Sequence, residues 1–84
     1  MKPFRGRVEQ NGRVVLAGVS GWLADGGVPW DGYIALPHGQ SVTRAGTYRL
    51  VLDDGRSGDM VISTIGYSGD APAVAHFRGV GPLG

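Results

Sequence analysis

The chain contains no cysteine, so it can form neither a disulfide nor a thiolate metal site, and packing alone has to hold the fold. Glutamate and lysine occur once each, at Glu9 and Lys2, which leaves few strong helix formers. No apolar run approaches the roughly 20 residues of a membrane span, and residues 1–7 lack the apolar core of a signal peptide. We therefore expect a cytoplasmic protein with no membrane contact.

Charge is also scarce: charged residues make up 18% of the chain, and the net charge is +1. This argues against non-specific binding to nucleic acid or anionic lipid as the main task. Hydrophobic residues make up 42%, beside 16 glycines and 5 prolines, which is typical of a folded domain rich in turns. With 84 residues there is room for one domain, residues 1–84, and its valines and aromatic residues favour an all-β fold.

The dipeptide Asn11-Gly12 predicts a two-residue type I′ turn, because both residues accept a positive φ. This turn sets Gln10 opposite Arg13. It then pairs apolar or small residues along one face: Val8 with Val15, Gly6 with Ala17, and Phe4 with Val19. We therefore expect an amphipathic hairpin over the first 20 or so residues.

A second hairpin is predicted from Thr47 to about Ile65. A tight Asp54-Gly55 turn would pair apolar with polar residues, so we favour a five-residue loop over 54–58. The longer loop pairs Leu52 with Met60, Leu50 with Ile62, and Tyr48 with Thr64. The predicted core is then formed by the inward positions of both hairpins: Phe4, Val8, Val15, Val19, Leu50, Leu52, Met60 and Ile62.

The remaining strands are short. We predict strands at 33–36, 41–44 and 73–80, and at most a single helical turn at 22–24. Five or six short antiparallel strands suit a small barrel, with a small β-sandwich as the alternative; we favour the barrel because closure protects the sheet edges. The tripeptides Phe4-Arg5-Gly6 and Phe77-Arg78-Gly79 suggest that the first and last strands pair to close it.

The chain carries no catalytic or metal-binding motif. It lacks Gly-x-Ser-x-Gly and His-Glu-x-x-His, and His38 and His76 are too few for a metal site of their own. The acidic loop with Asp53, Asp54 and Asp59 lacks the spacing of a calcium loop and is typical of a turn. We expect no enzyme activity, no metal and no cofactor.

Residues 21–33 concentrate the large aromatic side chains Trp22, Trp30 and Tyr33 in a glycine-rich segment. Such rings on a loop are typical of recognition surfaces for a sugar, a base or a proline-rich peptide. They equally suit a loop that folds back to cap the barrel end, and we favour that second interpretation for a core this small. We test the hypothesis that both tryptophans are at least about half exposed.

Arginine supplies seven of the eight positive charges. Arg5 and Arg7 share a strand face, and Arg78 would join them if the terminal strands pair, which would make a patch able to grip phosphates or carboxylates. The alternative is ordinary solvated charge, neutralised by Glu9 and Asp70.

These features favour a non-catalytic β-barrel that binds another protein or copies of itself. The expected contact residues are Trp22, Trp30, Tyr33, Arg56, Arg5 and Arg7. One alternative is an oligonucleotide-binding barrel that uses Arg5, Arg7, Arg78 and the aromatic residues. Another is a small carbohydrate-binding domain that uses Trp22 and Trp30 with Asp25 and Asp31.

Overall fold

A computed structural model describes residues 1–69 and 71–84 of the chain, and these form an all-β domain. The strands are β1 (Lys2–Gln10), β2 (Arg13–Ala24), β3 (Asp31–Ala35), β4 (Tyr48–Leu52), β5 (Ser57–Ser68) and β6 (Ala71–Val80). They close into one antiparallel barrel in the order β1-β2-β3-β6-β5-β4. The prediction of a small barrel rather than a sandwich is therefore confirmed.

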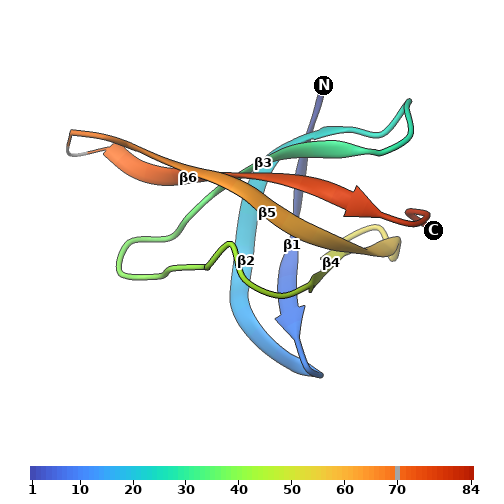
Figure 1. The fold of residues 1–84 in the computed structure, drawn as a ribbon, viewed down its shortest axis with the longest axis horizontal. Helices are drawn as coiled ribbons and strands as arrows, with labels where there is room; N and C mark the ends of the chain where they lie inside the picture. The colour runs from blue at the N-terminus through green and yellow to red at the C-terminus, as the bar shows by residue number, and fades with distance from the viewer. Residues whose placement is uncertain (70) are drawn as a thin grey trace.

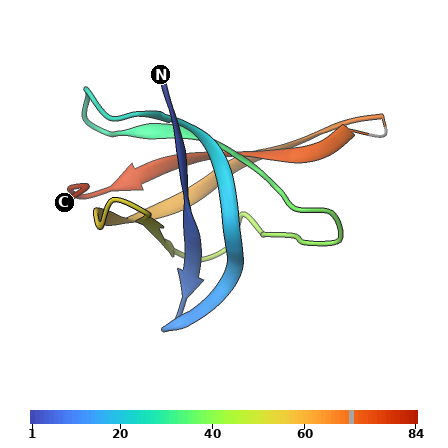
Figure 2. The same ribbon diagram turned by 180° about the vertical axis from the view of Figure 1, so that it is seen from behind.

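The barrel is built from two long hairpins, β1–β2 and β5–β6, which cross one another in Figures 1 and 2. The short strands β3 and β4 join them, because β3 pairs with β2 and β6 while β4 pairs with β1 and β5. The first and last strands therefore do not pair, and that prediction is wrong. Closure falls instead between β1 and β4, where Gly6 lies against the backbone of Val51 and Leu52.

The first hairpin has the predicted turn but not the predicted register. Asn11 and Gly12 both have a positive φ, and Gln10 lies opposite Arg13. Two irregularities then add residues to β2, so Val8 faces Leu16 and Gly6 faces Val19. Gly18, with a φ of 61°, lies in the second of them. Each extra residue shifts the following side chains to the other face, which buries Leu16 and leaves Ala17 exposed.

The second hairpin has a shorter loop than predicted. Leu52 N–H donates to the carbonyl of Arg56 at 2.8 Å, so residues 53–55 make the turn. Tyr48 then pairs with Met60, and Leu50 pairs with Gly58. The five-residue loop was favoured because it gave Leu50 an apolar partner; instead, the space over Gly58 is filled by the indole of Trp30, whose Cζ2 lies 2.7 Å from where a Cβ would stand.

The core follows the predicted alternation closely. Six of the eight expected residues are buried, and the other two, Phe4 and Val15, pack partly buried against them. Buried residues from β3 and β6, including Ile34, Ala75 and Phe77, complete the interior.

The segment between β3 and β4 departs from the sequence expectation. Residues 41–44 form no strand, although Val42 is buried in the core. The backbone N–H of Thr43 donates to the Tyr48 hydroxyl at 3.0 Å. Residues 22–24, expected as a helical turn, continue β2. Nothing in residues 1–69 and 71–84 forms a helix of the length and apolar character needed to cross a membrane.

Candidate functional site

An aromatic row crosses the outside of the barrel. Pro3, Trp22, Tyr33 and His76 lie directly opposite one another on β1, β2, β3 and β6. They point outward because alternate residues of these strands, such as Leu23 and Phe77, fill the core. Trp22 remains 54% exposed and Tyr33 41% exposed. Large apolar rings thus lie in water at adjacent positions of paired strands.

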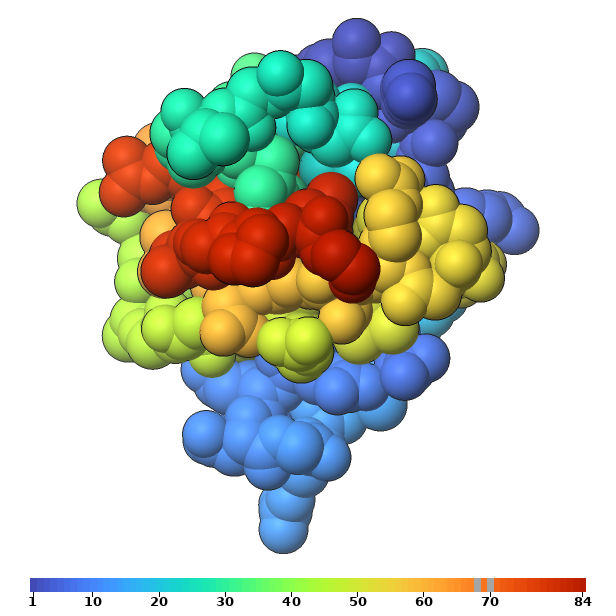
Figure 3. All heavy atoms as spheres, turned by 90° about the vertical axis from the view of Figure 1, so that its right-hand side faces the viewer, coloured from blue at the N-terminus to red at the C-terminus, as the bar shows by residue number. Residues whose placement is uncertain are grey.

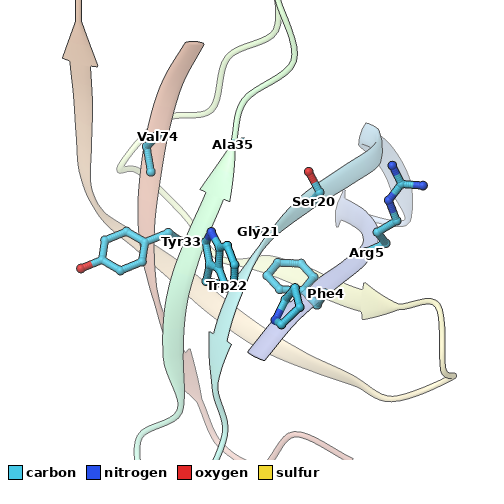
Figure 4. A pocket seen from close by; sticks show the side chains of 9 residues that line it. Phe4, Arg5, Ser20, Gly21, Trp22, Tyr33, Ala35 and Val74 are labelled. Carbon is cyan, nitrogen blue, oxygen red and sulfur yellow. The ribbon is translucent and has the colours of Figure 1, made fainter. Parts of the chain in front are cut away.

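A groove of about 470 Å³ runs beside this row. The next residues along the same face are Arg5, Ser20, Ala35 and Val74, again directly paired from β1 to β6. Ser20 and Ala35 are small, so the middle of the groove is low, while Trp22 and the other rings stand along its side. Figure 4 shows Arg5 at one end of the lining and Val74 at the other.

Trp30 does not contribute to this surface. It is 4% exposed, its ring packs edge-on against Phe77 with centroids 6.0 Å apart, and its Nε1–H donates to the Gly81 carbonyl at 2.9 Å. Gly58 and Gly79 provide the space for the indole. The hypothesis that both tryptophans are about half exposed is therefore wrong for Trp30 and right for Trp22. The expected core-capping role belongs to one of the two rings.

The C-terminal residues cover the Trp30 side of the barrel. Residue Gly84 exchanges two backbone hydrogen bonds with Ser57, at 2.8 and 3.0 Å. Figure 3 shows this segment, in red, between the turn before β3 and the β4–β5 turn. Pro82 and Leu83 lie beside Trp30 in the same hollow. Trp30 is thus held by Gly58 of β5 and by residues 77–83, both of which are distant from it in sequence.

Arg56, expected as a contact residue, binds two carboxylates of its own chain. Its Nη1 lies 3.0 Å from Asp25 Oδ2, and its Nε lies 3.0 Å from Asp54 Oδ2. The pKa of Asp25 is lowered mainly by this side-chain hydrogen bond, and the pKa of Asp54 mainly by the backbone N–H of Arg56. Arg56 therefore ties the β4–β5 turn to the end of β2. Asp59, another member of the acidic loop, likewise binds Arg49 at 3.0 Å.

Arg5 and Arg7 share the exposed face of β1, as predicted, but Arg78 does not join them. Arg7 donates through Nε to Glu9 Oε2 at 2.6 Å, and Arg78 lies on β6, with β2 and β3 between it and β1. Arg5 lines the groove, and in the part of the chain that the structure describes it forms no ion pair. Asp70, the other expected neutralising residue, lies outside the described residues.

His76 was not among the expected contact residues, and its neighbours are a serine and an aspartate. Ser63 Oγ lies 2.7 Å from His76 Nδ1 and also donates to the His76 carbonyl at 3.0 Å. Asp31 Oδ2 lies 3.5 Å from Nε2, and the ring is 4.8 Å from that of Tyr33. Ser63 Oγ has a single hydrogen, so it cannot donate to Nδ1 and to the carbonyl at once, and the tautomer of the ring decides which of them accepts it. The cluster thus orients the imidazole beside Tyr33.

Sequence reasoning named Trp22, Tyr33 and Arg5 but missed Pro3, Ser20, Ala35 and Val74. These four residues are of types that do not by themselves indicate a binding site. Only the pairing of β1, β2, β3 and β6 brings them together. No protein-family model, curated protein or solved structure matches this chain. The fold and the groove themselves are therefore the basis for a functional proposal.

Proposed function

We propose that this chain is a non-catalytic binding module that acts through contact with another protein or with copies of itself. The contact surface is the aromatic row together with its groove. The observation that carries the proposal is the exposure of Trp22 and Tyr33 at directly paired positions, in a chain that buries Trp30, Tyr48 and Phe77. Exposed aromatic rings beside a groove are characteristic of binding surfaces.

Energetics supports the same interpretation. Leaving about half of an indole in water forgoes on the order of 2–3 kcal/mol of burial free energy. A domain of this size has a net stability of roughly 3–5 kcal/mol, so the forgone amount is substantial. A partner that covers Trp22 recovers it as binding free energy.

Catalysis is not part of the proposal, because the sequence carries no catalytic motif and the serine–histidine contact found among the described residues has a structural explanation. The single hydrogen of the Ser63 hydroxyl has two acceptors beside it, His76 Nδ1 and the His76 carbonyl, and both belong to the neighbouring strand β6. Ser63 also lies at the register irregularity of β5, where its bonds to His76 have a structural use.

The two alternative functions have weaker support. An oligonucleotide site would need a cluster of cations, whereas Arg7 is bound to Glu9 and Arg78 lies across the sheet. A sugar site built on Trp22 and Trp30 would need both rings at the surface, whereas Trp30 is in the core. Contact with a protein requires only the exposed row and the groove.

Self-association and peptide binding can be tested with Trp22→Ser and a matched control, Val14→Ser. Val14 is 53% exposed on the same strand, close to the Asn11-Gly12 turn and outside the groove. Sedimentation velocity over a concentration series measures self-association, and a displayed random-peptide library panned on the immobilised chain measures binding to other sequences.

We expect self-association or peptide enrichment with the native chain, its loss with Trp22→Ser, and its retention with Val14→Ser. Far-UV circular dichroism checks that all variants fold. The proposal fails if the chain stays monomeric and enriches no peptide, or if the two variants behave alike. Tight, salt-sensitive binding of oligothymidylate in the same assays would favour the oligonucleotide alternative instead.

A further inference from the structure

The length of the groove limits what it can hold. Its lining residues come from β1, β2, β3 and β6, which are successive neighbours in the barrel. Three inter-strand spacings of about 4.8 Å span about 14 Å. An extended chain advances about 3.1–3.4 Å per residue, so about four or five residues fit between Arg5 and Val74.

The side chains that line the groove favour a bound peptide with a left-handed polyproline II backbone. Neither the Trp22 indole N–H nor the Tyr33 hydroxyl has a hydrogen-bond partner among the described residues. A polyproline II segment makes no internal hydrogen bonds, so its carbonyls are free to accept from such donors. Its pyrrolidine rings pack against aromatic faces, and its low conformational entropy reduces the cost of binding.

The charge of Arg5 favours an acidic residue at one end of the bound peptide. Arg5 is the only charged side chain that lines the described groove, and it has no ion-pair partner in residues 1–69 and 71–84. A carboxylate on the ligand would form a charge-assisted hydrogen bond with its guanidinium. A single-stranded nucleic acid across about 14 Å would bring two or more phosphates to this one cation, which favours a peptide with a single acid.

We propose that the groove binds a segment of four or five residues from another protein, rich in proline and flanked by one acidic residue that contacts Arg5. This inference rests on the proposed function and specifies its partner. Proline residues lie against Trp22 and Tyr33, and the acidic residue lies at the β1 end. The direction of the peptide is not fixed by these contacts, so both directions enter the test.

The test uses tetraproline peptides with aspartate at either end, the same peptides with asparagine, and a glycine–serine peptide with aspartate. Chemical-shift changes of the backbone amides and the indole N–H measure affinity. We expect one aspartate peptide to bind about five- to tenfold more tightly than its asparagine counterpart, because one charged contact is added. Arg5→Gln removes this difference, whereas the control Arg13→Gln keeps it. Trp22→Ser abolishes binding of every peptide.

Failure of this inference is separable from failure of the proposed function. If Trp22→Ser disrupts self-association or enrichment of other peptides while none of the proline peptides binds, the protein-contact function stands and the proline segment is wrong. If aspartate and asparagine peptides bind equally, the acidic contact is wrong. If oligothymidylate shifts the groove resonances and no peptide does, both proposals are overturned.

Discussion

The packing of the Trp30 indole over Gly58 and Gly79 gives the sharpest prediction about the fold. A methyl group at Gly79 would overlap the indole at Cε2, Cδ2 and Nε1. The ring has little freedom to recoil, because Gly58 lies beneath Cζ2, Phe77 packs edge-on, and Nε1 is bonded to the Gly81 carbonyl. We expect Gly79→Ala to destabilise the protein by about 3 kcal/mol, at the upper end of overpacking costs.

Removing the ring should relieve that clash. Trp30→Leu alone is expected to cost about 3 kcal/mol, through lost burial and a partly filled cavity. If the two costs were independent, Gly79→Ala with Trp30→Leu would lose about 6 kcal/mol and leave the chain unfolded, given a total stability of roughly 3–5 kcal/mol. Because leucine leaves room for the methyl group, we expect the double variant to lose no more than about 3–4 kcal/mol.

Urea unfolding followed by far-UV circular dichroism measures the four free energies, with trimethylamine oxide added equally to all samples to keep the single variants folded. Gly26→Ala is the control, since no atom lies within 4 Å of its added methyl position, and it should change stability by less than about 0.5 kcal/mol. If the double variant loses as much unfolding free energy as the two single variants together, Gly79 does not provide the space for the indole.

Two further predictions concern Trp22 and the ion pairs of Arg56 with Asp25 and Asp54. Trp22→Phe should leave only a blue-shifted emission that acrylamide quenches poorly, because the remaining indole is buried; quenching equal to that of the native chain would contradict this. Since Arg56 lowers the pKa of Asp25 and Asp54 below 3.8, their contribution to stability is present above that pH and is lost as pH falls through the lowered values. Arg56→Gln should therefore flatten the fall of the urea midpoint as the pH drops below about 4, whereas Arg44→Gln should leave that part of the profile unchanged.

The composition and the local patterns determined the all-β class, most of the strands, and six of the fifteen buried core residues among those that the structure describes. An excess of valine and aromatic residues over glutamate and lysine indicated strands, and Asn11-Gly12 indicated the first turn, because these preferences act within a few residues. Alternation identified inward positions on both hairpins, since side chains of a strand alternate between its faces. Trp22, Tyr33 and Arg5 were also named from the sequence as candidate contact residues.

Only the tertiary structure decided the registers, the closing strands and the separate fates of the two tryptophans. The register of β5 depends on an indole from residue 30 that fills the space over Gly58, and residues so far apart in the chain leave no local pattern. Likewise, the aromatic row exists because β3 pairs with β6 and places Tyr33 opposite His76. Packing between distant segments, which local propensity does not encode, places Trp30 in the core and leaves Trp22 beside the groove.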